Sequence, residues 1–266
     1  MEDARNPYAP PQAPVADPVE PRPVDEHETF IPNGRRVSLL QGMRWLGDAW
    51  RMFLARPGKW IVTFLLFILL YVVLSWVPFA NLVNSLLWPF LAAGIVMAAD
   101  LQRRTGTFAL GTLFEGFRRP APLFAIGALV LLSVVVLYVS FAVVTGTDGA
   151  NQFVLKARAA NGAARMSPRA ILSALALYTI LVLPLTAATY FAAPLVMFQR
   201  VSVGTAIKMS FIGSIKNVLP AIVFSVCAML FMIVSIIPLG LGLLVSIPVL
   251  MITNYIVYRD VFIDSR

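Results

Sequence analysis

Long apolar stretches dominate the chain, and they come in three pairs separated by polar segments. The six stretches lie at residues 60–77, 82–99, 123–144, 171–191, 219–237 and 243–258, and the fourth continues towards Phe198. A helix crosses the hydrocarbon of a bilayer with about 20 apolar residues. Inside lipid every backbone polar group must be paired internally, and unbroken rather than alternating apolar runs favour helices over a closed barrel. The pattern therefore predicts an all-α polytopic membrane bundle of six transmembrane helices, arranged as three hairpins.

A basic amphipathic segment precedes each hairpin and ends in a proline, and the return leg of each hairpin ends at an arginine. The prolines are Pro57, Pro120 and Pro220, and the arginines are Arg103, Arg200 and Arg259. This recurrence predicts an amphipathic interfacial helix in front of every hairpin.

Residues 38–55 are expected to form the first of these helices. Apolar side chains recur at helical spacing on one face, at Leu39, Met43, Leu46, Trp50 and Phe53. The other face carries Gln41, Arg44, Asp48 and Arg51, and the spacing of Arg44 and Asp48 suits an ion pair. The pattern is typical of a helix lying in the membrane interface, and it also fits a helix packed under the bundle. Both interpretations can hold together.

The other two segments repeat this pattern in shorter form. Within residues 100–119, an apolar stripe of Leu110, Leu113, Phe114 and Phe117 lies opposite Thr112, Glu115 and Arg118. Within residues 202–218, Ser202 suits an N-cap, and Val203, Ile207, Phe211 and Ile215 share a face.

The chain divides into two parts, a tail at residues 1–33 and a membrane domain at residues 34–266. The tail holds eight prolines, and its first 28 residues carry a net charge of −5. Proline removes backbone donors and like charges repel, so we expect a disordered tail with polyproline II character. The stretch from Pro7 to Pro11 would suit a docking peptide, but a solvated tail is the favoured interpretation.

Composition excludes an ordinary soluble domain. The chain is 59% hydrophobic and 13% charged, with a mean hydropathy of +0.82, whereas soluble domains carry roughly 25% charged residues. Beyond the acidic tail the balance is strongly basic. In a membrane protein this indicates loops that face anionic lipid rather than a nucleic-acid partner.

Positive charges near the spans predict the orientation. Placing the N-terminus inside leaves fifteen Lys and Arg residues in cytoplasmic segments and four outside, all in the 145–169 loop. The sequence thus predicts a bacterial inner-membrane protein with both termini cytoplasmic, no cleavable signal peptide, and a first span that serves as the insertion signal. Should the 145–169 loop stay inside, spans three and four would have to be re-entrant.

No catalytic, metal or cofactor signature is visible in the sequence. The single histidine, His27, lies in the tail, and the single cysteine, Cys227, lies in an apolar run. No acid lies inside a predicted span, and no phosphate loop, dinucleotide fingerprint or zinc spacing occurs. We therefore expect no enzymatic activity and no cofactor.

A few polar residues and prolines remain as candidates. Asp100 and Asp260 lie near Arg103 and Arg259 at the inner ends of spans two and six, where they suit either a coupling-ion or headgroup site or a salt-bridged helix end. Uncharged polar residues within the spans are expected to form interhelical hydrogen bonds, at Ser225, Ser235, Ser246, Thr253 and Asn254. Prolines inside the spans, Pro89, Pro184, Pro194 and Pro248, suit either kinks or the broken helices of a transport site. Gly94 and Ala98 suit close helix packing.

The basic segments supply candidate contacts with anionic lipid. They are Arg44, Arg51, Arg56, Lys59, Arg103, Arg104, Arg118, Arg119, Lys208 and Lys216. The leading hypothesis is a non-enzymatic protein that organises or assists a membrane partner or lipids. The alternative is a transporter or exporter of a small or lipidic substrate. The bilayer is the expected partner, with a further protein or a second copy of the chain as possible additions.

Short motifs also carry a resemblance. The stretch Asn6-Pro7-Tyr8-Ala9-Pro10-Pro11 looks like the start of many small bacterial inner-membrane proteins. The order of amphipathic helix, Arg56-Pro57, hairpin and closing Tyr258-Arg259-Asp260-Val261-Phe262 resembles an uncharacterised proteobacterial family of six-span proteins. That family is distantly similar to the membrane domain that precedes some glycerophosphodiester phosphodiesterases. The resemblance implies an inner-membrane location but no hydrolase activity, because the catalytic domain is missing from this chain.

Overall fold

The structure is a computed structural model that describes residues 28–76, 80–145, 172–173, 176 and 178–264. The tail up to residue 27, the 145–169 loop from residue 146 onward, and residues 171, 174, 175 and 177 of the predicted fourth span lie outside these described residues. Helices make up nearly all of the secondary structure that is described, together with one two-stranded sheet.

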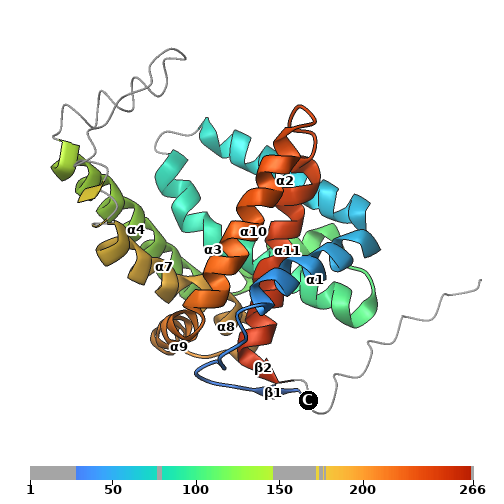
Figure 1. Ribbon diagram of the computed structural model, residues 1–266, viewed down its shortest axis with the longest axis horizontal. Helices are drawn as coiled ribbons and strands as arrows, with labels where there is room; N and C mark the ends of the chain where they lie inside the picture. The colour runs from blue at the N-terminus through green and yellow to red at the C-terminus, as the bar shows by residue number, and fades with distance from the viewer. Residues whose placement is uncertain (1–27, 77–79, 146–171, 174–175, 177, 265–266) are drawn as a thin grey trace, which may run out of the picture.

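Six helical segments of the described chain are long and apolar enough to cross a membrane, which confirms the prediction. They are α2 (Pro57–Ser75), α3 (Ala80–Thr105), α4 (Pro120–Thr145), a fourth span made of η2 (Tyr178–Val182), α7 (Leu183–Tyr190) and α8 (Ala192–Gln199), then α10 (Val218–Ile236) and α11 (Leu243–Phe262). The segments before the hairpins are α1 (Gln41–Ala55), η1 (Leu110–Arg118) and α9 (Val203–Lys216). The protein is an all-α polytopic membrane bundle (Figure 1).

Several ends of the spans differ from the prediction. The helices α2 and α4 begin at Pro57 and Pro120, because proline lacks an amide donor and suits the first helical turn. The helices α3 and α11 continue to Thr105 and Phe262, because the last turn of each carries basic residues, which suit a helix C-terminus: Arg103 and Arg104 in α3, and Arg259 in α11. The fourth span, by contrast, ends at Gln199, in agreement with the expected continuation of its apolar run past residue 191 towards Phe198.

A break at Phe191 divides the fourth span into α7 and α8. The buried hydroxyl of Ser210 in α9 accepts a hydrogen bond from the Phe191 amide at 2.9 Å and donates one to the Ala187 carbonyl at 2.8 Å. The hydroxyl therefore replaces the helical hydrogen bond that would join these two residues. This insertion fixes α9 against the broken span.

Spans three and four run antiparallel to each other. The Arg119 guanidinium, at the start of α4, donates to the Val196 carbonyl near the end of α8 at 2.9 Å. The third span is one continuous helix of 26 residues, which at about 1.5 Å per residue exceeds the thickness of a bilayer. The third span is therefore long enough to cross a bilayer, and Figure 1 shows α4 and α7 side by side.

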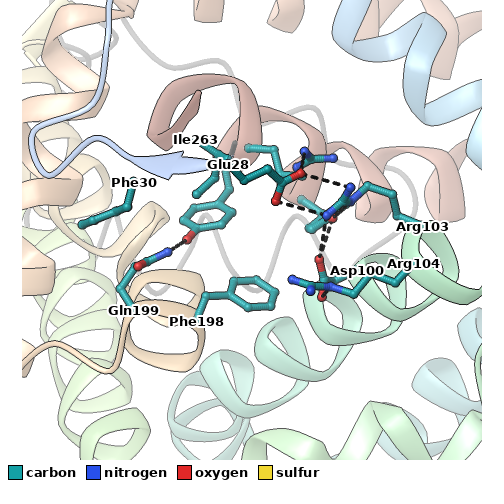
Figure 2. Close-up of a pocket in the computed structure, with 11 residues that line it drawn as sticks. Glu28, Phe30, Asp100, Arg103, Arg104, Phe198, Gln199 and Ile263 are labelled. Atoms are coloured by element: carbon teal, nitrogen blue, oxygen red, sulfur yellow. Dashed lines mark hydrogen bonds and ion pairs between the residues drawn. The ribbon is translucent and has the colours of Figure 1, made fainter. Parts of the chain in front are cut away.

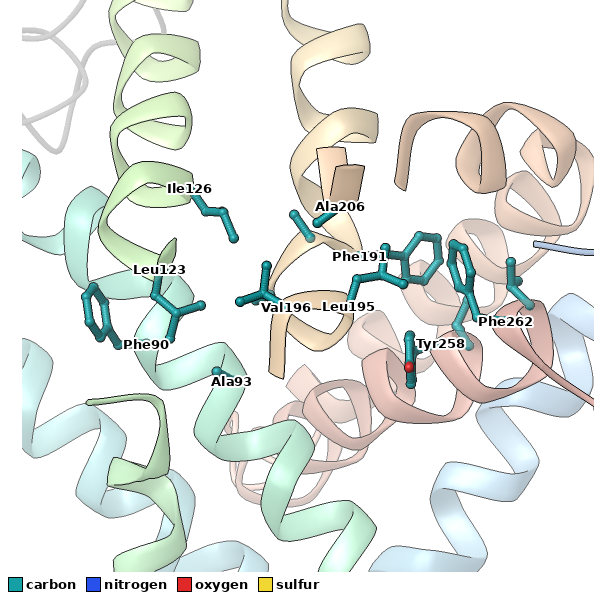
Figure 3. Close-up of a cluster of buried hydrophobic side chains, with 14 of the residues drawn as sticks. Phe90, Ala93, Leu123, Ile126, Phe191, Leu195, Val196, Ala206, Tyr258 and Phe262 are labelled. Atoms are coloured by element: carbon teal, nitrogen blue, oxygen red, sulfur yellow. The ribbon is translucent and has the colours of Figure 1, made fainter. Parts of the chain in front are cut away.

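The centre of the bundle is formed by α3 and α11. In the most apolar 18-residue stretch of each of these helices, half of the residues are buried. The corresponding share is 11% in α10 and 17% in α2. Figure 3 shows how α8 contributes Leu195 and Val196 between Leu123 of α4 and the aromatic rings of Tyr258 and Phe262. The outer spans α2, α4 and α10 thus present apolar side chains outward, as expected for helices that face lipid.

Helix α1 packs under the bundle and also exposes apolar side chains. Its buried side holds Trp45, Ala49 and Phe53. Beside this face, Met43 and Leu54 are each more than half exposed. The apolar side of α1 is therefore wider than predicted. Its packing under the bundle is confirmed, and its contact with the membrane interface stays a prediction. Asp48 pairs with Arg51 at 3.4 Å, so the predicted ion pair between Arg44 and Asp48 is wrong.

The segment η1 is a 3₁₀ helix that packs very closely on α3. A Cβ placed on Gly94 would overlap the Leu113 carbonyl, and one on Gly116 would overlap the Phe90 carbonyl. The prediction of close packing at Gly94 is confirmed, although its partner is the connecting segment. The apolar side chains of Leu110, Phe114 and Phe117 remain exposed.

The N-terminal segment is attached to the C-terminal end of α11 by a short sheet. Strand β1 (Thr29–Phe30) pairs antiparallel with β2 (Ile263–Asp264), and the Phe30 ring stacks on Phe262. The Asn217 side chain accepts from the Val37 amide at 2.9 Å and donates to the Arg35 carbonyl at 2.9 Å. Residues 28–33 are therefore part of the fold, and the predicted tail boundary at residue 33 is several residues too late.

Polar side chains within the spans mostly pair within their own helix. The hydroxyls of Ser225, Ser235 and Thr253 each donate to the carbonyl four residues earlier. The prediction of interhelical bonds is wrong for these three. Ser246 alone of the five candidates bonds to another helix within the described residues, donating to the Met232 sulfur at 3.5 Å.

Candidate functional site

A polar cavity of about 200 Å³ lies where α3, α8 and α11 end beside strand β1 (Figure 2). Three arginines and two carboxylates line it: Arg103, Arg104, Arg259, Glu28 and Asp100. We call it the arginine cavity. With three positive and two negative charges, its lining carries one excess positive charge.

Arg103 is the centre of the hydrogen-bond network. Its Nε donates to the Tyr255 hydroxyl at 2.8 Å, and its Nη1 lies 3.1 Å from the Glu28 carboxylate. The Tyr255 hydroxyl donates in turn to Asp100 at 2.8 Å. Arg104 donates to the other oxygen of Asp100 at 2.6 Å. Every side chain in this network is therefore bonded to at least one partner from a different helical turn or a different element.

Glu28 bridges two helices through its carboxylate. One oxygen accepts from Arg259 of α11, and both oxygens accept from Arg103 of α3. Its side chain is 11% exposed, whereas those of Arg103 and Arg259 are 23% and 22% exposed. The pairing of β1 with β2 brings this carboxylate to the cavity, as Figure 2 shows.

A second ion-pair cluster lies near the C-terminal end of α11. The Arg35 guanidinium pairs with Asp260 at 2.9 Å and with Asp264 at 3.2 Å. The other oxygen of Asp260 accepts from the indole of Trp45 at 2.8 Å. This cluster joins the N-terminal segment, α1 and α11.

The predicted helix-end acids are therefore salt-bridged, but only one has the partner expected. Asp100 lies 3.9 Å from Arg103 and pairs more closely with Arg104. Asp260 binds Arg35 instead of Arg259, because Arg259 is engaged by Glu28. Sequence reasoning missed Glu28 by assigning it to the tail. The β-forming run Thr29-Phe30-Ile31 that follows it was the available signal.

Eight of the ten predicted lipid-contact cations are engaged by the protein itself. Arg103 and Arg104 lie in the arginine cavity. The partners of the other six are Asp48 for Arg51, Glu115 for Arg118, the Gly106 carbonyl for Arg56, Thr107 and the Phe108 carbonyl for Lys59, the Val196 carbonyl for Arg119, and the carbonyls of Asn33 and Gly34 for Lys216. Arg44 and Lys208 are exposed, and the described residues offer their side chains no hydrogen bond or ion pair.

Chemically, the arginine cavity is suited to hold an anion. Guanidinium groups bind carboxylates and phosphates in planar, bidentate fashion, and here Glu28 supplies the carboxylate. Among the described residues, no group of three or more His, Cys, Asp or Glu side chains could hold a metal ion.

Comparisons with protein-family models, curated proteins and solved structures found no match to this chain. The resemblance to a six-span proteobacterial family stays a prediction.

Proposed function

We propose that this is a non-enzymatic protein of a bacterial inner membrane that organises anionic lipid, or a partner held in such lipid, at its cytoplasmic face. The observation that carries the proposal is the arrangement of α1, η1 and α9. Three contacts bring the connecting segments to one end of the bundle. They join Arg119 to Val196, Arg103 to Tyr255, and Lys216 to Gly34.

Each of these three segments leaves apolar side chains exposed at that end. They are Leu39, Leu40, Met43 and Leu54 at α1, Leu110, Phe114 and Phe117 at η1, and Phe211 and Ile215 at α9. Exposed apolar side chains beside exposed cations are the pattern of interfacial helices that contact anionic headgroups. Arg44 on α1 and Lys208 on α9 supply unpaired cations at this surface.

The acids of the described chain support a role without catalysis. Each of the six is ion-paired to an arginine: Glu28, Asp48, Asp100, Glu115, Asp260 and Asp264. A carboxylate held in this way is poorly suited to act as a general base, because oxygens that already accept from a guanidinium have fewer lone-pair sites left for a substrate proton. We therefore assign the arginine cavity to holding the helix ends together.

Neutralising Arg44 and Lys208 together is expected to reduce the preference for anionic lipid several-fold. Each cation near a charged membrane surface contributes about 1 kcal/mol. The measurement is quenching of tryptophan fluorescence by brominated phosphatidylglycerol compared with brominated phosphatidylcholine. Trp50 on α1 is 38% exposed and would report contact with quencher.

The matched control for this experiment is the double substitution Arg51→Gln with Arg118→Gln. It removes the same charge from positions that are also exposed, but both arginines already have carboxylate partners. The control should keep most of the preference. Equal quenching of the wild-type protein by both lipids would refute the proposed function.

The proposed orientation places the tip between α10 and α11 outside the cytoplasm. Leu239, at this tip, is 97% exposed. In a Cys227→Ala background, Leu239→Cys should react with an impermeant maleimide added to spheroplasts, whereas Arg44→Cys should react only after lysis. The reverse pattern would show that the membrane orientation is opposite.

A further inference from the structure

A second cavity, of about 340 Å³, lies among α3, α4, α7, α8 and α11. We call it the lateral cavity. Its volume falls at the lower end of the range of about 300–1,000 Å³ found for small-molecule sites. All the residues that line it are uncharged and belong to membrane-spanning segments.

The lining shows that the lateral cavity opens sideways. Its inner wall includes Ile126, Val182 and Ala193, each no more than 6% exposed. Other lining residues lie on the outer surface of the bundle, including Trp88 and Val134, which are 49% and 43% exposed. Because the outer surface of these spans faces hydrocarbon, the occupant would enter from the bilayer.

One buried polar atom at the lateral cavity has no partner. The Asn254 Oδ1 is the single buried side-chain oxygen or nitrogen of the described residues that lacks a hydrogen bond. An acceptor buried without a donor is unfavourable, and native proteins rarely leave one unsatisfied. A ligand hydroxyl fits this position well, because it can donate to the oxygen of a carboxamide and accept from its nitrogen.

Three hydroxyls that line the lateral cavity already donate elsewhere. Ser133, Thr186 and Thr189 line the lateral cavity, and each donates to the carbonyl four residues earlier in its own helix. Their oxygens can still accept hydrogen bonds. Pro194, also in the lining, has no amide donor for the Tyr190 carbonyl. The oxygens of these three hydroxyls and of the Tyr190 carbonyl thus favour a ligand that donates a hydrogen bond. The amide nitrogen of Asn254 can itself donate one.

We propose that the lateral cavity binds the chain of a neutral lipid that carries a hydroxyl group, with the hydroxyl at Asn254. The uncharged lining disfavours a charged group, and the apolar walls suit an acyl or alkyl chain. This site does not depend on the proposed function, since anionic lipid would contact Arg44 and Lys208 at the end of the bundle.

The test uses the full-length protein in phosphatidylcholine nanodiscs and a long-chain alcohol with a diazirine on its chain. The matched probe is the methyl ether of the same alcohol, which cannot donate a hydrogen bond. After irradiation, peptide mass spectrometry should place the crosslinks of the alcohol on α4 near Val130 and Val134, and on α7. The alcohol should label these positions at least about fivefold more than the ether, as expected when a buried acceptor gains a donor.

The substitution Asn254→Leu keeps the size of the side chain and removes the acceptor. It should abolish the preference for alcohol over ether while leaving apolar labelling in place. Thr253→Val is the matched control, because Thr253 is adjacent on α11 but bonds to the Val249 carbonyl and does not line the lateral cavity. This control should keep the preference.

Three outcomes would overturn the inference. Equal labelling of the wild-type protein by the two probes would do so without any variant, even if Asn254→Leu failed to fold. Crosslinks spread over the outer surfaces of α2 and α10, with none concentrated at the lateral cavity, would also do so. The third outcome is that neither probe labels the lateral cavity while a water-soluble thiol reagent labels Ala193→Cys. That result would favour transport of a small polar solute.

Discussion

Glu28→Gln is expected to destabilise the protein by about 2 kcal/mol. Removing one partner of a fully buried ion pair costs about 3–5 kcal/mol, and the arginines here keep some exposure to solvent, which lowers the value. Glutamine has nearly the same shape but leaves Arg103 and Arg259 without the counter-charge that Glu28 supplies just before β1. The excess positive charge of the arginine cavity then rises from one to two.

The loss can be measured as the free energy of unfolding in mixed micelles titrated with sodium dodecyl sulfate. Trp45 and Trp60 are 1% and 0% exposed, so intrinsic fluorescence reports unfolding of the bundle. The matched control is Glu115→Gln, which removes the partner of Arg118. The Arg118 side chain is 76% exposed, and such pairs contribute at most about 1 kcal/mol. Equal effects of the two substitutions would mean that Glu28 does not hold the helix ends together.

The second large effect is expected at Gly94. Gly94→Ala should destabilise the protein by about 3 kcal/mol, at the upper end of the usual cost of overpacking. The added Cβ overlaps the backbone carbonyl of Leu113, and a backbone atom cannot move aside by changing rotamer. Relief requires η1 to shift away from α3, which also disturbs the stacking of Phe90 on Phe117 at 4.9 Å between ring centroids.

Gly47→Ala supplies a control of opposite sign. Gly47 lies in helix α1 with no atom within 4 Å of an added Cβ, so alanine should stabilise the helix by up to about 1 kcal/mol. Both variants are compared in the same detergent titration. If Gly94→Ala unfolded at the same detergent fraction as the wild-type protein, the close contact between η1 and α3 would be disproved.

Much of the candidate site could be located from sequence, but not its connections. Asp100, Arg103 and Arg259 were identifiable because charged residues at the ends of apolar runs mark the membrane boundary. Their partners were not identifiable. Arg259 pairs with Glu28, which is 231 residues away, and no local pattern indicates which chain segment will lie against a helix end. Only the pairing of β1 with β2 brings the two together.

The lateral cavity illustrates the same limit within the spans. Sequence identified Pro194 and Asn254 as unusual residues of spans four and six, with kinks and interhelical bonds as the expected roles. Ser225 and Thr253 instead satisfy themselves on their own helices, because a short hydroxyl side chain reaches the carbonyl one turn earlier. The longer carboxamide of Asn254 depends on what packs around α11, and the packing there leaves its oxygen unpaired beside a cavity.

The sequence by itself determined the six spans, the three amphipathic segments and the all-α class, because the transfer of a helix into lipid depends on the composition of that helix alone. Only the tertiary structure decided which face of α1 is buried, which acids meet which arginines, and where the cavities lie. Those features depend on contacts between segments far apart in the chain, such as Arg35 with Asp260 and Ser210 with Ala187. Hydropathy sets the depth of each residue in the membrane, whereas helix packing sets its neighbours.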